Sequence, residues 1–386
     1  MKRQGRRGFA LMISIFALVI IGAVVAGGYF VAAQQFRVAA AGPQASSAFY
    51  AAEAGLNAAM AEWDSARADS LEPGAAMMLK SGQLESGDEY SARVIRLDAG
   101  QDQRTTYYLA IATGRAHGPR GGRRQVALFL RGRRFEGLCC DAALSARGAV
   151  RVAGGAAIRG LDLVPPAWAS VPDACQGAKR GAGPGILSDA PDLVELGSGA
   201  VVEGDPPIED AAVIGPEPFA ENARLLQELA ELADLRYAGG VTLRSFAPAT
   251  TADGECARSA SGNWGAPDMP DHACFDYYPI VYVDGDLSID SPGRGQGILL
   301  VEGDFELGGG FEFNGVVIVR GRLITGEGGG RVWGGVVVHN VSLDTVLIGA
   351  GAEVDYSGCA VHRALWNSKV HLPQPLAEFA WFEILE

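Results

Sequence analysis

The sequence predicts a protein of the α+β class that is mainly β, with one long N-terminal helix, a small antiparallel sheet and a parallel β-helix. Residues 9–33 carry no charge, three runs between residues 90 and 130 alternate apolar and polar side chains, and a glycine-bearing motif recurs at a fixed interval from residue 281. These are signatures of a transmembrane helix, of antiparallel strands and of a solenoid. We therefore expect a basic leader at 1–8, a helix at 9–67, a small sheet at 68–135 and a glycine-rich β-solenoid domain at 136–386.

The composition bounds the class of protein. The chain has 386 residues, which is more than one compact core usually holds, and 48% hydrophobic with 20% charged residues is a globular composition. Its 53 glycines have no collagen period and indicate many tight turns in β-architecture. The net charge of −13 argues against a nucleic-acid partner.

The first element is the uncharged stretch from Phe9 to Ala33, which is long enough to cross a bilayer. Basic residues precede it at Lys2, Arg3, Arg6 and Arg7, so the positive-inside rule leaves the N-terminus in the cytoplasm and the body outside. A cleaved secretory signal would have a shorter apolar region. Two other interpretations fit its length. One is a plain signal-anchor, and the other is cleavage between Gly8 and Phe9, directly before the stretch.

The interior of this stretch contains small residues spaced four apart, which allow helix backbones to approach closely in a bilayer. A helix that only anchors a protein does not need them, whereas a helix that packs among other helices does. The predicted packing pairs are Gly22 with Ala26, Ala23 with Gly27, and Gly28 with Ala32.

The helix is expected to continue beyond the membrane. Residues 44–67 are rich in alanine and place apolar side chains three or four positions apart, at Phe49, Ala52, Leu56, Ala59 and Trp63. This stripe predicts packing against the following domain. Gly42-Pro43 is expected to kink or interrupt the helix, because proline lacks a backbone donor and clashes with the preceding turn.

A basic leader ending in glycine, a phenylalanine that opens an uncharged helix, and Ala48-Phe-Tyr-Ala-Ala-Glu-Ala-Gly-Leu56 together carry a resemblance to a known family. The region resembles the N-terminus of PilX-type minor pilins of type IV pili, over residues 1–65 and loosely over 66–135. The most specific part of the match is the AEAGL motif, Ala52, Glu53, Ala54, Gly55 and Leu56.

The resemblance implies processing and assembly. Prepilin peptidase would cut between Gly8 and Phe9, and the new amino terminus would be methylated. The implied partners are other pilins, the pilus assembly machinery and the membrane. The implied location is the bacterial inner membrane, with the body in the periplasm, and the cell exterior once the subunit is assembled.

One position departs from the family. Most pilins have a glutamate five residues into the mature chain, where this sequence has Ile13. In the family that glutamate pairs with the amino terminus of a neighbouring subunit, and an ammonium buried without a partner is costly. Some minor pilins and the K-type pseudopilin of type II secretion also lack it, so we expect a low-copy minor subunit rather than the major pilin.

The next elements are strands. Runs at 90–97, 105–113 and 124–130 alternate apolar and polar residues between glycine- and proline-containing connections, which predicts a small antiparallel sheet on which the helix lies.

The repeat follows. Its copies Val281–Ile289, Leu299–Leu307 and Val317–Thr325 are equally spaced, and Gly335–Leu343 is expected on the same register. Self-similarity with a period of about 18 residues predicts a solenoid of stacked coils. We expect further coils from 143–163 and 193–208, an inserted helix near 216–235, and a cap at 372–386 whose aromatic residues cover the last coil.

All six cysteines follow the apolar stretch, which in an oxidising compartment suggests disulfides. We favour a bridge between Cys256 and Cys274, which flank a polar loop. The pairing of the other four stays open, and these are Cys139, Cys140, Cys175 and Cys359. The absence of C-x-x-C and the scattered histidines argue against zinc.

The sequence shows little catalytic chemistry. It has no Walker A, H-E-x-x-H or G-x-S-x-G motif, so we expect no enzyme and no cofactor. Calcium is the alternative at two aspartate clusters, although EF-hand spacing is absent and aspartate next to glycine is ordinary turn chemistry. The clusters are Asp268, Asp271, His272 and Asp276, and Asp284, Asp286 and Asp290.

Two classes of function remain. In the first, the protein is a minor pilin that takes part in pilus assembly or tip initiation and in adhesion, or a K-like pseudopilin. In the second, it is a membrane-anchored periplasmic β-helix protein that acts on carbohydrate. The second class would be expected to show Arg or Lys clustered with Asp and aromatic residues across several coils.

Overall fold

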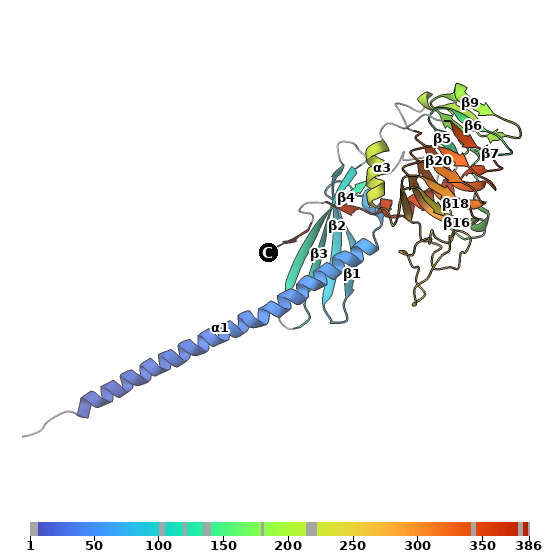
Figure 1. Cartoon of the computed structure of the whole chain (residues 1–386). Coiled ribbons are helices and arrows are strands. Elements are labelled where there is room, and N and C mark those ends of the chain that lie inside the picture. Colours follow the sequence, from blue (N-terminus) through green and yellow to red (C-terminus); the bar gives the residue numbers. More distant parts are fainter. Residues whose placement is uncertain are drawn as a thin grey trace, which may run out of the picture. The chain divides into compact units, whose positions relative to one another are not determined.

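The computed structural model describes residues 7–99, 105–118, 122–133, 140–178, 181–213, 222–340, 345–376 and 381–384. The fold is mainly β with some helix (Figure 1). The chain divides into two compact units. The first comprises Met1–Gly132 with Gln374–Glu386, and the second Arg133–Pro373.

The first unit begins with α1 (Arg7–Ala61), one helix of 55 residues with Pro43 inside it. The prediction for Gly42-Pro43 was a kink or an interruption, and the interruption is wrong because the helix continues through both residues. Proline removes only one donor, and the preceding residue is a glycine, which has no side chain to clash with the proline ring. A short helix α2 (Ser65–Asp69) follows, and the Asp64 carboxylate accepts a hydrogen bond from the Arg67 N–H at 3.0 Å.

The antiparallel sheet packs on the second half of α1. Its strands are β1 (Ala76–Gln83), β2 (Glu89–Ala99), β3 (Thr105–Arg115) and β4 (Arg123–Arg133), in the spatial order β1-β2-β3-β4. The three strands expected from the alternating pattern are confirmed, and β1 was not expected. The core between helix and sheet contains Leu56, Val94, Tyr108, Val126 and Leu130.

The end of the chain completes this sheet. The strands β23 (Gln374–Pro375) and β24 (Trp381–Ile384) pair antiparallel with β4. The Phe382 ring lies 5.5 Å from that of Phe129, and Glu383 pairs with Arg124 at 3.1 Å. The expectation that 372–386 cap the repeats is therefore wrong for the described tail strands, because β4 offers them an open edge. Phe379 lies outside the described residues.

The second unit is built from two parallel sheets (Figure 1). The larger has eleven strands, β5 (Leu144–Ala146), β7 (Ala157–Arg159), β8 (Ile186–Ser188), β10 (Val201–Glu203), β11 (Ile208–Asp210), β12 (Leu235–Ala238), β14 (Ile280–Asp284), β16 (Arg294–Val301), β18 (Phe311–Val319), β20 (Gly330–Val338) and β22 (Glu353–Tyr356). The smaller has seven, β6 (Val150–Val152), β9 (Val194–Leu196), β13 (Val241–Leu243), β15 (Leu287–Ile289), β17 (Phe305–Leu307), β19 (Leu323–Thr325) and β21 (Val346–Ile348).

The pairing register follows the sequence repeat for its first copies. Val281 pairs with Leu299 and Leu299 with Val317, so each copy of the motif lies beside the next. The fourth copy is displaced by one, because Val317 pairs with Val336 and not with Gly335. The connection between β19 and β20 is one residue longer than that between β17 and β18, which accounts for the shift. Residues 341–343 of that copy lie outside the described chain.

The order of strands in space differs from their order in the sequence. The last strands of the repeat, β20, β21 and β22, pair with the early strands β5, β6 and β7, onto which β8, β9 and β10 stack. The expected contribution of 143–163 and 193–208 is thus confirmed as strands. The chain then crosses to β12 at the far end through α3 (Asn222–Glu231), which lies within the predicted 216–235, of which residues 216–221 are not described.

The larger sheet is buried on both faces. One face packs on the smaller sheet through residues such as Val281, Leu299 and Phe305. The other face packs through Ile280, Ile298 and Ile318 against α3, α4 (Gly358–Trp366) and the buried Trp168. This explains why its strands read as continuous apolar runs. Short 3₁₀ turns complete the unit, η1 (Pro166–Trp168), η2 (Pro191–Leu193), η3 (Ala211–Val213) and η4 (Lys369–His371).

Candidate assembly surface on the N-terminal helix

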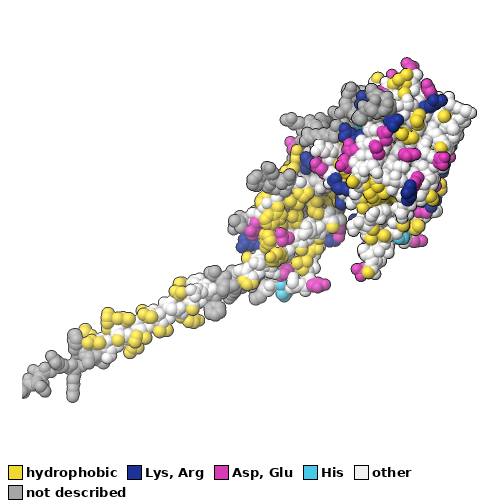
Figure 2. Space-filling model, viewed as in Figure 1, with side chains coloured by type: hydrophobic (Ala, Val, Ile, Leu, Met, Phe, Trp, Pro, Cys, Tyr) yellow, Lys and Arg dark blue, Asp and Glu magenta, His cyan; other side chains and the backbone are white. Residues whose placement is uncertain are grey.

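The first half of α1 extends beyond the sheet and exposes its apolar side chains (Figure 2). The segment Met12–Gln35 spans 24 residues, about 36 Å at 1.5 Å per residue, and is long and apolar enough to cross a membrane. A helix of this length and composition near the N-terminus is a candidate membrane span or signal sequence. Its large side chains are exposed over the whole circumference, with Phe16 at 67% and Tyr29 at 79%.

The glycines predicted to pack against other helices have no neighbouring side chains or backbone around their Cβ positions. A Cβ added at Gly22, Gly27 or Gly28 would meet no atom within 4 Å. Each glycine thus leaves an indentation along the helix that another helix can enter.

The alanines of the same predicted pairs are exposed as well. These are Ala23, Ala26 and Ala32. The predicted helix packing therefore has no partner within the described part of this chain, and the small-residue pairs remain a candidate contact for other molecules. Gly8 and Phe9 lie in the first turns of α1, and their side chains are outside the described part of the chain.

The AEAGL motif lies where α1 meets the antiparallel sheet. Ala52, Gly55 and Leu56 are buried against the sheet, whereas Glu53 and Ala54 are half-buried on the flank. A Cβ on Gly55 would lie 2.8 Å from the Tyr90 ring, so only glycine allows this approach. The spacing of the motif therefore places Ala52, Gly55 and Leu56 on the one face of the helix that contacts the sheet.

Gly114 of β3 permits the closest contact between helix and sheet. A Cβ there would lie 1.9 Å from the Ala48 carbonyl oxygen and 2.4 Å from the Ala52 nitrogen. The helix backbone thus rests directly on the strand backbone. Sequence reasoning missed this residue, although a glycine inside an alternating strand is a known sign of close backbone approach.

Asp88 also stabilises the contact between α1 and the sheet, through hydrogen bonds. Its carboxylate accepts hydrogen bonds from the Ser47 hydroxyl of α1 at 2.5 Å, the His117 N–H at 2.7 Å and the Ser86 hydroxyl at 2.8 Å. These bonds, led by that of Ser47, hold the pKa of the Asp88 carboxyl below its ordinary value. One ionised side chain therefore joins the helix, the β1–β2 turn and the end of β3.

The depressed pKa predicts an acid-sensitive attachment. Asp88 contributes stability while it is ionised, above the unfolded-state pKa of about 3.9. The contribution is lost as the pH falls through the lower folded-state pKa, because the proton then displaces accepted hydrogen bonds. We expect the free energy of unfolding of the native chain to fall more steeply below about pH 4 than that of Asp88→Asn. Parallel pH profiles in denaturant titrations would contradict this role.

Arg96 of β2 binds the end of the short helix α2, which follows α1. Its Nη1 donates to the Asp69 and Leu71 carbonyl oxygens, both at 2.7 Å. The Tyr108 hydroxyl bonds the Asp69 carboxylate, and its ring meets Trp63 edge-on at 5.3 Å. The sheet thus holds the second half of α1 through Asp88 and the chain just after it through Arg96 and Tyr108, while the apolar half of α1 is exposed.

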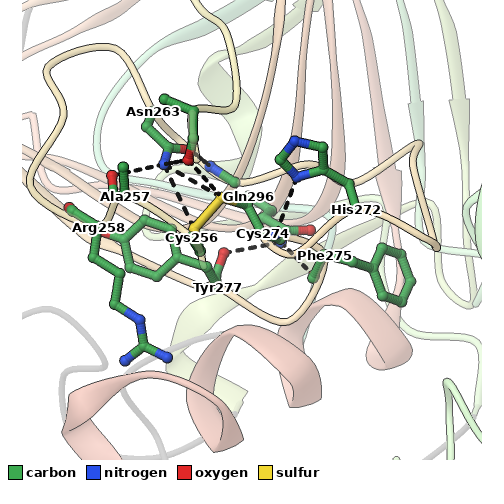
Figure 3. The surroundings of a disulfide bond; sticks show 11 residues. Cys256, Ala257, Arg258, Asn263, His272, Cys274, Phe275, Tyr277 and Gln296 are labelled. Carbon is green, nitrogen blue, oxygen red and sulfur yellow. Dashed lines mark hydrogen bonds between the residues drawn. A yellow bond between two sulfur atoms is a disulfide. The ribbon is translucent and has the colours of Figure 1, made fainter. Parts of the chain in front are cut away.

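Disulfides support the second unit. Cys256 and Cys274, the pair favoured from the sequence, are bonded, and Cys175 is bonded to Cys359. Around the first bridge, the buried Asn263 donates to the Ala257 carbonyl at 2.9 Å, and Gln296 donates to that of Phe275 at 2.7 Å (Figure 3). Cys140 is also disulfide-bonded, and Cys139 lies outside the described residues.

Two of the three candidate calcium ligands on the first repeat, Asp286 and Asp290, are engaged in other contacts. Asp290 receives Arg244 through two nitrogens, at 2.7 and 2.9 Å, and Asp286 accepts the Asp304 N–H at 2.8 Å. Asp284 is exposed. Asp286 and Asp290 therefore stabilise local contacts of the chain.

The second candidate cluster is likewise engaged. Asp268 pairs with Arg294 and Asp276 with Arg363, each at 2.7 Å. The Nδ1 atom of His272 accepts the Cys274 N–H at 3.0 Å, and Asp271 is exposed. Within the described ranges no three His, Cys, Asp or Glu side chains converge on a metal position.

Comparisons with protein-family models, with curated proteins and with solved structures find no match to this chain. A bare apolar half of α1 and a firmly attached second half are therefore the features on which a function can be argued.

Proposed function

We propose that the protein is a pilin-like structural subunit, a minor pilin of a type IV pilus. The observation that carries the proposal is the division of α1 into two halves. Met12–Gln35 is apolar and exposed, and residues 48–56 are seated on the sheet through Gly55 and Gly114. Such a helix is stable only where lipid or other helices surround its first half, and small-residue indentations suit it to both environments.

The topology and processing belong to the same proposal. The basic leader holds the N-terminus in the cytoplasm, and the two units lie in the periplasm until assembly. Prepilin peptidase removes residues 1–8 and leaves Phe9 as a methylated amino terminus. Ile13 cannot form an ion pair with the amino terminus of a neighbouring subunit. The subunit therefore initiates the fibre or lies at its tip, and it is present in few copies. The same residue favours a K-like pseudopilin of type II secretion as the second candidate.

The displayed part is, in this proposal, a parallel β-helix. Successive strands alternate between the two sheets, since β14, β16 and β18 belong to the larger sheet and β15, β17 and β19 to the smaller. Equal steps in the sequence between the paired strands from β14 to β19 support coils of one size in this part of the domain. Charges on the coil surfaces pair with each other along the stack, as Arg322 does with Asp304 at 2.7 Å and Arg320 with Glu302 at 2.7 Å. We assign this domain display and adhesion, with no catalytic step.

Processing gives the experiment that tests the proposal. In a host with active prepilin peptidase, Gly8→Ala should accumulate with its leader attached and be missing from filaments sheared from the cells. Gly5→Ala, which changes a glycine of the same leader away from the junction, should be processed as the native chain is. Immunoblots and mass spectrometry distinguish the forms. Normal cleavage and assembly of Gly8→Ala would overturn the proposed site.

A further inference from the structure

The two parallel sheets of the second unit are assembled from two separate segments of the chain (Figure 1). The first segment, residues 144–210, contributes β5 to β11, and the second segment, residues 235–356, contributes β12 to β22. They meet along a seam, where β5 pairs with β20, β6 with β21 and β7 with β22. The chain runs from the first segment to the second between β11 and β12, which are strands at opposite ends of the larger sheet. The strands that pair at the seam are therefore far apart in the sequence, and no short turn joins them.

The strand pairs at the seam are short. The strands β5, β6 and β7 are each three residues long. Side chains add polar contacts across the seam, since Arg159 pairs with Asp355 at 2.8 Å and the Asn340 amide donates to the Arg147 carbonyl oxygen at 2.8 Å. In a stack of this kind each layer is stabilised by its neighbours. The interface without a short chain connection is therefore the one at which the stack can divide.

One disulfide crosses from the first segment to the second. Cys175 lies in the connection between β7 and β8, and Cys359 lies in the first turn of α4, shortly after β22. The two cysteines are 184 residues apart in the sequence. The Cys256–Cys274 bond, in contrast, lies within the region of the second segment and joins residues only 18 apart. A bond that closes a long loop removes more conformational freedom from the open chain than one that closes a short loop.

Polar contacts around this disulfide attach the same connection to α4. The Asp162 carboxylate accepts the Gly358 N–H at 2.9 Å, and Nη1 of Arg363 donates to the Ala174 carbonyl oxygen at 3.3 Å. Arg363 is buried, and its guanidinium lies 4.9 Å from the centre of the Trp168 ring. The disulfide therefore holds in place a group of contacts that form only while the two segments are together.

The two sulfur atoms of the bond differ in exposure. Cys359 is 1% exposed, whereas Cys175 is half-buried and is followed by the exposed Gln176 and Gly177. An attacking thiolate therefore reaches the Cys175 sulfur first. A dithiol forms a mixed disulfide with Cys175 and releases Cys359 as a thiolate, which takes up a proton. The second thiol of the dithiol then displaces Cys175, so the protein gains two electrons and two protons and the dithiol becomes a disulfide.

We propose that the Cys175–Cys359 disulfide is a redox-sensitive clasp on the seam. While the bond is intact, the first segment stays paired with the second. When a dithiol reduces the bond, β5, β6 and β7 open from β20, β21 and β22 far more often, whereas β14, β16 and β18 stay stacked. The clasp requires neither α1 nor a fibre, so it goes beyond the proposed function.

Hydrogen exchange measured by mass spectrometry on the full chain in detergent tests the proposal. In Cys175→Ala/Cys359→Ala, amide protection of residues 144–159 should fall by about 100-fold or more, because the open state regains the freedom of a long loop. Protection of residues 298–319 should stay as in the native chain. Cys256→Ala/Cys274→Ala is the matched control. It removes the disulfide that does not cross the seam and should leave residues 144–159 as protected as in the native chain.

Dithiothreitol applied to the control variant gives a second measurement, which does not depend on the folding of Cys175→Ala/Cys359→Ala. It should lower the protection of residues 144–159 in the same way, and alkylation of Cys175 and Cys359 verifies that the bond has opened. Unchanged protection of residues 144–159 after loss of the bond would overturn the proposal. An equal loss in residues 298–319, an equal loss in the untreated control variant, or a bond that resists dithiothreitol would also overturn it.

Discussion

Gly114→Val is expected to release the N-terminal helix from the antiparallel sheet. The added Cβ would lie 1.9 Å from the Ala48 carbonyl oxygen, and backbone atoms on both sides cannot rotate away. We expect a loss of about 3 kcal/mol or more in the free energy of unfolding of the first unit, at the upper end of overpacking costs. Hydrogen exchange measured by mass spectrometry should show protection lost in residues 48–56.

Gly28→Ala is the matched control for this result. Gly28 lies in the same helix, but a Cβ there would meet no atom within 4 Å. We expect protection of the helix to be unchanged or slightly greater, since alanine favours a helix over glycine by roughly 0.5–1 kcal/mol. If Gly114→Val kept the protection of the native chain, the proposed seat of α1 would be wrong.

Gly334→Ala is expected to unfold much of the second unit. Gly297, Gly315 and Gly334 stand in one column of the larger sheet, each with a positive φ, and a Cβ on Gly334 would lie 1.9 Å from the Gly315 carbonyl oxygen. Backbone strain and steric overlap then act together. We expect a cost of roughly 3 kcal/mol or more, measured by denaturant unfolding.

Gly310→Ala separates the two causes. Gly310 also has a positive φ, of 73°, but space for a Cβ. Its substitution should cost only the strain of the left-handed conformation, about 1 kcal/mol. Equal losses at Gly310 and Gly334 would show that backbone conformation alone matters and that the close stacking of the glycine column does not.

Local patterns predicted the elements whose signals are local. The long helix and the strands β2, β3 and β4 follow from uncharged length and from alternation. The strand β1 escaped because its register shifts between Met78 and Lys80, which breaks the alternation of its side chains. The helix was wrongly predicted to be interrupted at Pro43. That prediction considered the effect of one residue, whereas many contacts along the helix stabilise it.

Long-range pairing had no local signal. The tail strand β24 joins β4 across most of the chain, and β5 stacks on β20, although Leu144 and Val336 lie far apart in the sequence. Apolar character alone could not choose between capping the repeats and completing a sheet. The regular period predicted the paired strands well until one added residue before β20 displaced the fourth copy.

The site was predicted in part. The motif residues Ala52, Gly55 and Leu56 were recognised by resemblance, and their burial against the sheet supplies the physical reason for their spacing. Gly114 and Asp88 were not recognised, because their partners Ala48 and Ser47 lie far away in the sequence. The helix side of the contact carries a motif, whereas the sheet side carries single residues in ordinary strands and turns.

The central claim is that α1 belongs to a processed, pilin-like subunit. Mass spectrometry of the intact protein, extracted from membranes of a host with active prepilin peptidase, tests it most directly. We expect a mature chain that begins at Phe9 and carries one methyl group on its amino terminus. A chain that still begins at Met1 in that host would contradict the claim.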